Sequence, residues 1–487
     1  MKPLLLLAAG CSALAAASTV AAQPAPAVPA ETAARFDAIF ADIGADGPGC
    51  AAGVFRDGKL LIARGYGLAN VELGVPISEA TVFDIGSVSK QFTVMAVVLA
   101  AQDGKLSLDD DIRRFLPELR DYGSKITVRH LIHHSSGIPD FLNLMFLRGQ
   151  DERDGVTMPE ILDLMARQDA LMFAPGTAFS YSNTGYVLLA EIVARASGQS
   201  FSAFSDERIF KPLGMDNTHV HDDAGRIVPR RAYAYHADAE KGLTVGGSNF
   251  AVPGDGAVYT TLGDLQKWDA DFDRGRVWTP AVKAEMLRVA HLPDGQPVAT
   301  ASGAVYAGGL GLARYRGLDV VRHGGAWAGY VADLVHFPKQ RLGVAVLCNV
   351  DAVDPASLAN SVADLFLAKA FTEAPRAPAD EEEMRLPDGA SPPAGALLDA
   401  FAGRYRSEQI DADYVIRRKG DSLVFEAGPR RTPFDFGAMG LPLFQLGEDR
   451  LGSPLFQLRF DKPGQRVDAF VMEMDRVGPV RFVRVAD

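Results

Sequence analysis

A serine and a lysine stand three residues apart in FDIGSVSKQF, residues 83–92, directly ahead of the apolar stretch TVMAVVLAA. A charge that enters the interior is costly unless it is paired. Positions i and i+3 of a helix share one face, so a helix that begins near Ser87 places its hydroxyl beside the Lys90 ammonium. The amino end of that helix adds positive potential and unbonded N–H groups. The pair could activate a serine nucleophile without a histidine, whereas the alternative is an ordinary surface Ser/Lys pair.

Two further groups could take part in the same chemistry. Tyr181 and Asn183 lie in FAPGTAFSYSNTGYVLLAEIV, just before an expected helix. A phenol is a poor base at its ordinary pKa of about 10, but a nearby ammonium favours the phenolate. An asparagine amide can bond both a lysine and a substrate amide. The alternative for Tyr181 is a half-buried loop tyrosine.

A third group is His323-Gly324-Gly325, at the end of an expected strand. Glycines there permit a ligand to lie along the strand edge. Tyr-x-Asn occurs nowhere else among the 12 tyrosines, and His-x-Gly occurs nowhere else among the nine histidines, so neither pairing recurs at random along the chain. The competing Lys462-Pro463-Gly464 looks like a hairpin turn in the C-terminal segment.

In this order, Ser-x-x-Lys, Tyr-x-Asn and Lys/His-x-Gly resemble the penicillin-recognising serine hydrolases. The resemblance is closest to the class C β-lactamase-like branch, with its DD-carboxypeptidases, D-aminopeptidases and esterases. It extends through TVRHLIHHSSGIPD (127–140), SGQSFSAFSDERIFKPLGMDNT (197–218) and GDGAVYTTLGDLQKW (254–268), and covers about 34–370. It implies an α/β (α+β) fold of the β-lactamase/transpeptidase type. That fold has an antiparallel five-stranded sheet flanked by helices and an all-helical subdomain.

The resemblance also implies roles for these residues. Ser87 would attack a carbonyl carbon, and Lys90 and Tyr181 would share the general acid and base work. Asn183 would orient Lys90 and the substrate. His323, Gly325 and Ala326 would line the substrate, with an oxyanion hole formed by the backbone N–H groups of Ser87 and Ala326. The resemblance implies no metal and no organic cofactor.

The departure from the family pattern is His323, where lysine is commoner. A histidine is mostly neutral at pH 7 unless its pKa is raised. We therefore expect weak β-lactamase activity. We also expect a preference for substrates with a carboxylate only where the ring is protonated.

The elements that must position these groups follow from the pattern along the chain. Residues 34–374 alternate strands and helices, including a hairpin that turns at Asp57-Gly58 and a helix that ends at Gly198. The strands DVVRHGG, GYVADLVHFP and GVAVLCNV come late. Residues 375–395, rich in proline and acidic residues, indicate a linker. Residues 396–487 have short aromatic and β-branched strands, typical of a separate small all-β module, and resemble the lipocalin-like barrels of some family members. This module is expected to shape access or assembly, without catalytic residues.

The N-terminus resembles an export signal. Residues 1–22 combine Lys2, an apolar core and a small-residue cleavage site that ends at Ala22. Cys11 in AAGC offers the alternative of a lipoprotein acylation site. Residues 23–33 indicate a Pro/Ala linker. We expect an exported, periplasmic or secreted protein with no transmembrane segment.

Three cysteines and a histidine cluster remain. Cys50 and Cys348 are either a disulfide or two buried thiols. In the fold that the resemblance implies, the first and last strands of the sheet are antiparallel neighbours, so these two residues could lie opposite each other. His130, His133 and His134 look like a metal cluster, but the resemblance implies a structural turn at that segment.

The functional prediction is a serine hydrolase that acts through an acyl-enzyme on ester, amide or D-amino-acid peptide bonds. The partner is therefore a small-molecule or peptide substrate. A net charge of −12 over 487 residues argues against nucleic acid. The alternatives are a class C-type β-lactamase and a weakly catalytic penicillin-binding or sensor-like protein. The sequence does not indicate an oligomeric state.

Overall fold

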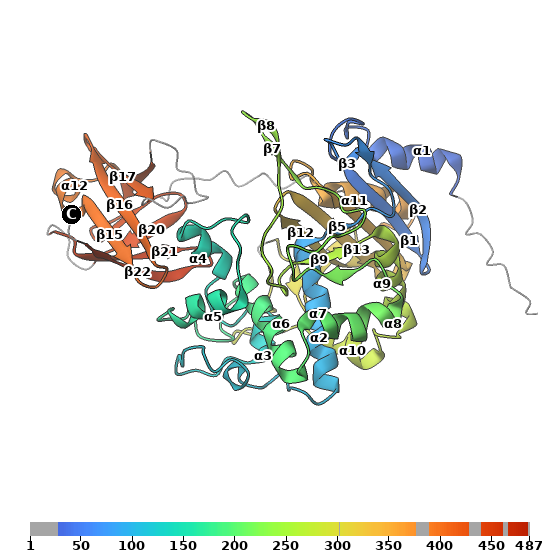
Figure 1. Cartoon of the computed structure of the whole chain (residues 1–487), viewed down its shortest axis with the longest axis horizontal. Helices are drawn as coiled ribbons and strands as arrows, with labels where there is room; N and C mark the ends of the chain where they lie inside the picture. Colours follow the sequence, from blue (N-terminus) through green and yellow to red (C-terminus); the bar gives the residue numbers. More distant parts are fainter. Residues whose placement is uncertain (1–27, 301, 376–388, 428–439, 461–465, 486–487) are drawn as a thin grey trace, which may run out of the picture.

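The computed structural model describes residues 28–300, 302–375, 389–427, 440–460 and 466–485. These ranges form a large α/β part and a small closed barrel that lies against one end of it (Figure 1). Across the described ranges, no helix combines the length and apolar character that a membrane crossing requires.

The large part is built on one antiparallel sheet. Its strands are β1 (Cys50–Arg56), β2 (Lys59–Tyr66), β10 (Val305–Tyr306), β11 (Gly311–Tyr315), β12 (Leu318–Trp327), β13 (Tyr330–Phe337) and β14 (Leu342–Cys348). Their spatial order is β10-β11-β12-β13-β14-β1-β2. The predicted fold class is confirmed, and the sheet has seven strands rather than five because β10 and β11 extend it beyond β12. The predicted hairpin is β1–β2, whose turn residues Asp57 and Gly58 both have positive φ.

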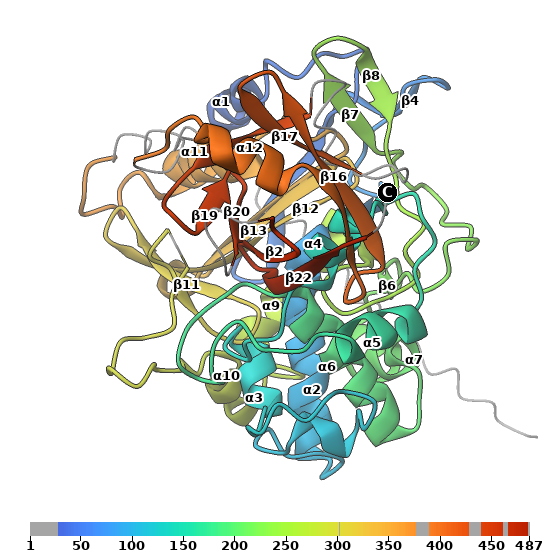
Figure 2. The ribbon, with the colours of Figure 1, turned by 90° about the vertical axis from the view of Figure 1, so that its left-hand side faces the viewer.

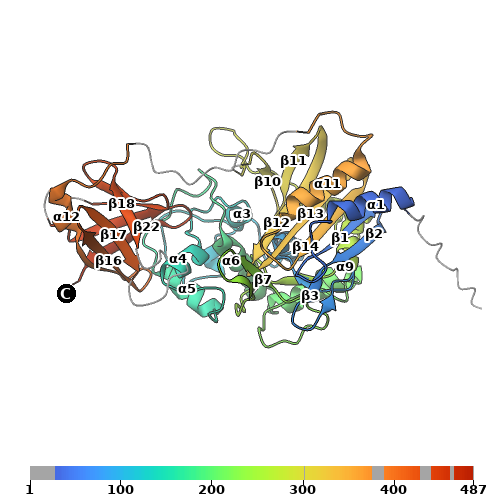
Figure 3. The ribbon, with the colours of Figure 1, turned by 90° about the horizontal axis from the view of Figure 1, so that it is seen from above.

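Helices cover both faces of this sheet. On one face lie α1 (Ala30–Ile39) and α11 (Pro355–Leu367) (Figure 3). Residues of both helices share one buried apolar cluster with Cys50, Ala52 and Val54 of β1. On the other face, α9 (Leu262–Arg274) packs against β1, β2 and β14. Because both faces are covered, every residue of β13 and β14 is buried, which explains their nearly continuous apolar sequences.

A helical subdomain lies beside the sheet and surrounds α2 (Lys90–Gln102), which packs against α6 and α10 (Figure 2). Its other helices are α3 (Val128–Ile132), α4 (Phe141–Leu147), α5 (Met158–Ala166), α6 (Asn183–Ser197), α7 (Phe201–Ser205), α8 (Lys211–Leu213) and α10 (Pro280–Met286). Helix α6 ends at Gly198, as predicted, with that glycine at φ 75°. Nearly all of α2 is buried, so the apolar stretch after Lys90 is a core helix.

Short elements connect these layers. The short strands are β3 (Leu68–Asn70), β4 (Val75–Pro76), β5 (Phe83–Asp84), β6 (His219–Val220), β7 (Tyr235–Asp238), β8 (Gly242–Val245) and β9 (Val258–Thr260). The single-turn helices are η1 (Gly86–Ser89), η2 (Ile112–Arg114), η3 (Asp206–Phe210) and η4 (Pro338–Gln340). The small sheet β5-β9-β6 anchors β5, which leads directly into η1. This connection fixes the position of Ser87.

The second part is the closed all-β module that the sequence predicts. It begins with α12 (Gly395–Phe401) and continues through β15 (Gly403–Ser407), β16 (Ala412–Lys419), β17 (Ser422–Ala427), β18 (Leu441–Gln445), β19 (Arg450–Gly452), β20 (Phe456–Arg459), β21 (Ala469–Met474) and β22 (Gly478–Arg484). Strand β22 pairs with β15 and closes the barrel. The barrel docks on the helical subdomain: the Tyr414 hydroxyl donates to the Leu147 carbonyl at 2.5 Å, and both residues are buried.

The segments expected to be linkers include regular elements in the residues that the structure describes. Helix α1 begins at Ala30, inside the expected linker 23–33. Of the expected linker 375–395, residues 376–388 lie outside the described ranges. Ser391 pairs with Gln445 of β18, and α12 begins at Gly395. The expected signal peptide 1–22, with Cys11, also lies outside the described ranges.

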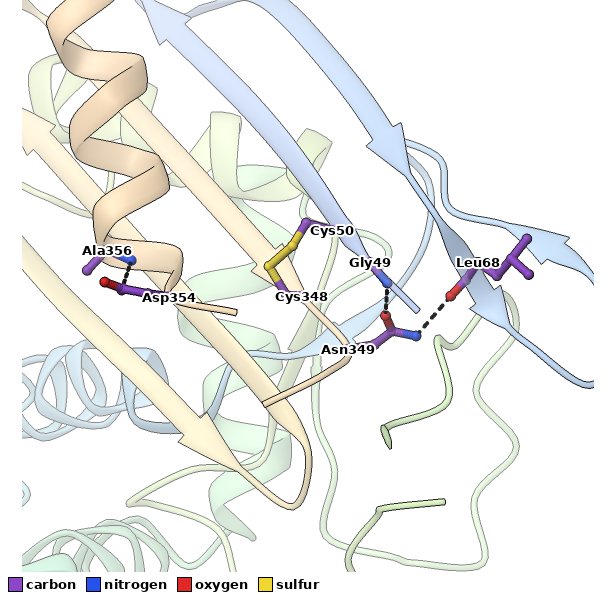
Figure 4. Close-up of a disulfide and its surroundings, with 7 residues drawn as sticks. All are labelled: Gly49, Cys50, Leu68, Cys348, Asn349, Asp354 and Ala356. Atoms are coloured by element: carbon purple, nitrogen blue, oxygen red, sulfur yellow. Dashed lines mark hydrogen bonds between the residues drawn. A yellow bond between two sulfur atoms is a disulfide. The ribbon is translucent and has the colours of Figure 1, made fainter. Parts of the chain in front are cut away.

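Cys50 and Cys348 form a disulfide that joins β1 to β14 (Figure 4). The register places the two residues directly opposite each other, which confirms the pairing expected from the family fold. Next to it, the Asn349 side chain accepts from the Gly49 N–H at 2.8 Å and donates to the Leu68 carbonyl at 3.1 Å. The first and last strands are therefore joined both covalently and through a buried amide.

Candidate active site

Ser87 lies in the η1 turn between β5 and α2. The turn is fixed by Asp84, whose Oδ1 accepts from the Gly86 N–H at 2.8 Å. Burial raises the pKa of this Asp84 carboxyl to about 7. Gly86 has φ 49°, a left-handed conformation that other residues adopt at a cost. The predicted helix therefore starts as a tight turn, and the regular α-helix begins at Lys90.

The Lys90 ammonium is fully buried and has three acceptors. Its Nζ donates to Ser87 Oγ at 3.0 Å, to Asn183 Oδ1 at 2.9 Å and to the Asp255 carbonyl at 2.7 Å. An ammonium has three donors and no acceptor, so all three of its hydrogens are used. This geometry fits a protonated lysine that holds the serine oxygen in place.

Tyr181 and Asn183 approach Lys90 from the start of α6. The Tyr181 ring centroid lies 4.9 Å from Lys90 Nζ. Ser182 caps the helix with its side chain, which accepts from the Gly185 N–H, and its own N–H donates to His134 Nδ1 at 3.0 Å. Burial lowers the pKa of His134 well below its usual value, so the ring is neutral and can accept this bond.

Asp140 supports the same loop from behind. It caps α4, and its buried Oδ2 accepts from the Asn183 N–H at 2.5 Å. The same oxygen lies 3.0 Å from Nη2 of Arg476, which belongs to the barrel. Arg476 also donates from Nε to the Tyr181 carbonyl at 2.7 Å. The Tyr181–Asn183 loop is thus held from two distant parts of the chain, the segment 134–140 and the barrel.

The opposite side of the site is the end of β12. A Cβ on Gly325 would lie 2.0 Å from the Ile85 carbonyl oxygen and 3.0 Å from the Ser87 nitrogen. A Cβ on Gly86 would lie 2.8 Å from the Ala326 nitrogen. Only glycines allow the η1 and β12 backbones to come this close. This close approach brings the backbone nitrogens of Ser87 and Ala326 close together.

His323 lies on the same strand and has a defined tautomer. Its Nδ1 is 2.6 Å from the Gly324 carbonyl, which can only accept, so Nδ1 carries the proton. Its Nε2 then accepts from the Tyr306 hydroxyl at 3.1 Å. Burial and the Lys90 ammonium lower the pKa of His323 to about 4. The sequence led us to expect that His323 gains its proton near neutral pH, but in the structure this protonation occurs only under more acidic conditions.

Two openings adjoin these groups. A pocket of about 70 Å³ reaches Ser87 and Asn183 and is lined by Asp84, Asp255 and the apolar Leu142, Phe250 and Trp327, among other residues. A wider cleft of about 880 Å³ lies on the far side of Tyr181, between the helical subdomain and the barrel. Ser87 therefore borders a narrow pocket, and Tyr181 borders a broad cleft.

The structure brings all the predicted site residues to one place: Ser87, Lys90, Tyr181, Asn183, His323, Gly325 and Ala326. The sequence interpretation missed His134, Asp140, Tyr306 and Arg476. His134 and Asp140 lie in the quoted segment 127–140, so the signal was present but assigned only to a turn. Of the histidine cluster, His134 belongs to the loop support. In the described part of the chain, no three histidine, cysteine or acidic side chains are grouped so as to hold a metal ion.

Known sequences relate this chain to one family. A family model described as Beta-lactamase matches residues 36–368. A D-aminopeptidase of Gluconobacter oxydans is 30% identical over 318 residues, which are 65% of this chain and 59% of that protein. The match thus spans less than two thirds of that relative. Penicillin-binding protein 4* of Bacillus subtilis is 27% identical over 418 residues, 80% of this chain and 89% of that protein.

Solved structures share the fold. An octameric penicillin-binding protein homologue from Pyrococcus abyssi superposes with a TM-score of 0.62 at 24% identity and covers 93% of this chain and 99% of its own. The D-amino acid amidase from Ochrobactrum anthropi, complexed with L-phenylalanine amide, has a TM-score of 0.59 at 23% identity and covers 70% of this chain and 99% of its own. The first of these extends over the barrel as well as the α/β part.

Proposed function

Because the chain belongs to the beta-lactamase family, we propose that it is an exported serine hydrolase that cleaves amide, ester or D-amino-acid peptide bonds through an acyl-enzyme. The observation that carries this proposal is the set of bonds from one buried Lys90 ammonium to Ser87 and Asn183. The alternative was an ordinary surface Ser/Lys pair, but the Lys90 ammonium is buried, and burial of a charge is costly unless the charge is paired.

In the acylation step, Ser87 Oγ forms a bond to the substrate carbonyl carbon and loses its proton. Lys90 already donates three hydrogen bonds, so the proposed acceptor for that proton is the phenolate form of Tyr181, whose ring centroid lies 4.9 Å from Lys90 Nζ. The nearby ammonium stabilises the negative charge that a proton-accepting phenol oxygen carries. The proton then passes to the leaving nitrogen or oxygen as its bond to carbon breaks. Water attacks the acyl-serine in the same manner and releases the acid.

The tetrahedral intermediate carries a negative oxygen. The backbone N–H groups of Ser87 and Ala326 are the proposed donors to this oxygen. The tight packing of Gly86 and Gly325 supports this role, because it holds the two donors together before the substrate arrives. Preorganised donors need no rearrangement during the reaction, and removal of one such donor typically costs about 10²–10³ in kcat.

The proposed substrate class rests on the relatives and on the pocket. Relatives include D-aminopeptidases, and the carboxyl groups of Asp84 and Asp255 line the pocket beside Ser87. Burial raises their pKa values to about 7 and about 6, so these carboxyls favour a substrate with a free amino group where the pH is above those values. The narrow pocket suits a small acyl side chain, and the broad cleft beyond Tyr181 can take a larger leaving group. A D-aminoacyl amide or a short peptide with such a residue at its amino end fits both openings.

Export is part of the proposal. Disulfides persist in oxidising compartments and are rare in the reducing cytosol, so the Cys50–Cys348 bond supports it. We infer that residues 1–22 direct export and that cleavage follows Ala22, with acylation of Cys11 as the alternative. Mass spectrometry of the N-terminus of the protein purified from its native envelope distinguishes the two.

The test is a substrate panel of nitrophenyl esters, D- and L-aminoacyl nitroanilides and a chromogenic cephalosporin. We expect hydrolysis of the ester and the D-nitroanilide, loss of both in Ser87→Ala, and severe loss of acylation in Tyr181→Phe. Ser361→Ala and Tyr233→Phe, at exposed positions, are the matched controls. Activity that survives in Ser87→Ala would overturn the mechanism.

A weakly catalytic penicillin-binding protein is the second candidate, because one relative that is covered over 89% of its length is named a penicillin-binding protein. The two candidates differ in deacylation. A labelled penicillin that stays bound to Ser87 through gel electrophoresis, with no product release and no hydrolysis in the panel, would favour this candidate. Rapid cephalosporin turnover would instead favour a class C-type β-lactamase.

A further inference from the structure

The last hairpin of the barrel reaches the Tyr181–Asn183 loop. Strands β21 and β22 are joined by a turn at Asp475-Arg476-Val477, closed by a bond from the Val477 N–H to the Met474 carbonyl at 3.2 Å. This turn lies against the start of α4. The Asp140 N–H donates to the Arg476 carbonyl at 2.7 Å, and the Asn143 side chain donates to the Asp475 carbonyl at 3.4 Å.

The Arg476 side chain extends from this turn to both catalytic motif residues of the loop. It bonds the Tyr181 carbonyl through Nε, and its guanidinium carbon lies 5.3 Å from the Tyr181 ring centroid. Its Nη2 pairs with Asp140 Oδ2, the oxygen that also accepts from the Asn183 N–H. One guanidinium thus contacts Tyr181 directly and Asn183 through a single shared oxygen.

The charge balance of the loop depends on this contact. Asp140 is fully buried, and Arg476 is the charged partner that the structure gives it. Removal of one partner from a buried pair leaves an uncompensated charge, which is strongly unfavourable. Without Arg476, the Asp140 carboxylate would lose its charged partner beside the backbone N–H of Asn183, the residue whose side-chain Oδ1 accepts from Lys90 Nζ.

The backbone of Arg476 supports a specific purpose for its side chain. Its φ is 63°, in the left-handed region, where a residue other than glycine, asparagine or aspartate is unusual. Such a conformation persists where the surroundings fix it, often at functional sites. A glycine would suit the turn better, so the arginine is explained by what its side chain contacts rather than by the turn.

We propose that Arg476 is a positioning residue of the active site: it neutralises Asp140 and holds Tyr181 and Asn183 in the geometry for acylation, so the barrel completes the catalytic centre. This inference rests on the proposed function, because it takes Ser87 acylation as the reaction. It replaces the expectation that the barrel contributes no residue to catalysis.

The test measures kcat and KM in the full-length protein for wild type, Arg476→Ala and Arg476→Lys with the ester or nitroanilide that the panel identifies. A displacement of about 1 Å in a catalytic group can reduce the rate about 100-fold. We expect kcat to fall about 100-fold in Arg476→Ala, with KM changed less than about threefold, because the group acts on positioning rather than on substrate binding. Lysine can pair with Asp140 but lacks the planar fork, so Arg476→Lys should be intermediate.

Chemical rescue and coupling separate positioning from general destabilisation. Millimolar guanidinium, far below denaturing concentrations, should restore part of the kcat of Arg476→Ala by occupying the vacated site beside Asp140. In an Asp140→Asn background, which removes the charge that Arg476 neutralises, the further effect of Arg476→Ala should shrink to less than about tenfold. If the losses of kcat in Arg476→Ala and Asp140→Asn simply add in the double variant, Arg476 does not act through Asp140.

Two matched controls separate this role from docking of the barrel. Tyr414→Phe removes a buried docking bond of the barrel, and Arg417→Ala removes an exposed barrel arginine that pairs with Glu426. Both should keep wild-type kcat. An Arg476→Ala protein with unchanged kcat would overturn the inference while Ser87→Ala remained inactive, whereas an active Ser87→Ala would overturn the proposed function itself. An equal loss in Tyr414→Phe would show that docking, not Arg476, is responsible.

Discussion

The two sides of the candidate active site are built in different ways. Ser87 and Lys90 are three residues apart, and one turn of backbone plus the close approach of β12 fixes them. Tyr181 and Asn183 lie on a loop supported by His134, Asp140 and Arg476, which come from distant parts of the chain. The nucleophile is therefore positioned locally, and the proposed base is positioned by tertiary contacts.

This difference has a physical consequence. A short turn next to a buried helix keeps its geometry as long as the core is intact. A loop held by three remote side chains depends on each of those contacts, including one from a separate barrel. Substitutions at Ser87 or Lys90 should slow the reaction because they remove a reacting or activating group. Substitutions among the residues that support the Tyr181–Asn183 loop should slow it because they displace Tyr181 and Asn183.

The largest expected effect follows from loss of the lysine. Lys90→Met keeps the buried stem but removes the charge and all three hydrogen bonds of Nζ. Without this ammonium, Ser87 loses its hydrogen bond and the proposed Tyr181 base loses the charge that stabilises it. Acid–base assistance contributes about 10²–10⁴ to rate, so we expect kcat/KM to fall about 10³-fold or more. The measurement is the rate of acylation by a fluorophosphonate probe together with steady-state kinetics.

Lys241→Met, on an exposed lysine with 75% of its side chain accessible, is the control and should be silent. Thermal unfolding of Lys90→Met reports whether it folds. If Lys90→Met folds and keeps kcat/KM within about tenfold of wild type, Ser87 is activated without Lys90. The proposal that the turn from Ser87 to Lys90 positions the nucleophile for its chemistry would then be wrong.

The sequence predicted the local side well and the remote side incompletely. The spacing of Ser87 and Lys90 is enough to place them together, because i and i+3 of a helical turn are neighbours whatever the rest of the fold does. The β1–β2 hairpin and the end of α6 at Gly198 are equally local, and both are confirmed. The barrel was recognisable as an all-β module from its short strands.

Arg476 could not be found in this way. Nothing near it in the sequence differs from an ordinary charged hairpin turn, and its partner Asp140 is 336 positions earlier in the chain. Which barrel turn meets the helical subdomain depends on docking, which local patterns do not encode. Asp140 carried a weaker signal, since it begins a helix after a proline, as a capping carboxylate does.

The second prediction tests the backbone approach that holds the local side. In Gly325→Ala the new Cβ would lie 2.0 Å from the Ile85 carbonyl, so β12 and η1 must separate. Overpacking of this kind typically costs about 1–3 kcal/mol of stability. Because the Ser87 and Ala326 donors move apart, we expect kcat to fall about 100-fold.

The neighbouring Gly324→Ala is the matched control. Its Cβ would meet only ordinary contacts, the nearest at 3.6 Å from Asp333 Oδ2. It should retain kcat within about threefold and unfold at nearly the wild-type temperature. Equal kcat losses in the two variants would show that the strand edge tolerates no side chain at all, and the specific separation of η1 from β12 would not be the cause.

The disulfide should affect stability and leave both sides of the site unchanged. It joins β1 to β14 with both sulfurs buried in the sheet core that faces α1 and α11, and it closes a long loop of sequence separation 298. Loss of such a bond typically costs about 2–5 kcal/mol. We expect Cys50→Ser/Cys348→Ser to unfold at lower denaturant concentration, with kcat within about twofold of wild type.

A thiol titration of the unfolded protein checks the bond itself. Reduction should add two titratable thiols per chain to the unreduced sample. If no thiols are added, the cysteines are not bonded in solution. A double variant with strongly reduced kcat would instead mean that the sheet and the site are more tightly coupled than the local geometry of Ser87 implies.

The smallest expected effect concerns His323 and pH. With its pKa lowered to about 4, the ring is neutral throughout pH 5.5–8.5, so it gives no charge to attract a substrate carboxylate in that range. The ratio of kcat/KM for a matched pair of substrates, one neutral and one with a carboxylate, should therefore change less than about twofold with pH. His323→Lys introduces a charge at every pH in the range, and it should shift this ratio toward the carboxylate by up to about tenfold.

The same lowered pKa has a defined sign for stability. The unfolded chain binds a proton at His323 near pH 6.5, but the folded protein does so only near pH 4. The contribution of the neutral His323 ring to the free energy of unfolding is therefore fully present above about pH 6.5, and it is lost as the pH falls toward 4. His323→Gln, which cannot titrate, should lose less stability between pH 6.5 and 4 than wild type, as urea unfolding at a series of pH values can measure.

An equal loss in the two proteins would mean that the neutral Nδ1–H ring, bonded to Gly324 and Tyr306, does not contribute to acid sensitivity. The buried His133 and His134, whose pKa values are also lowered, would then account for it.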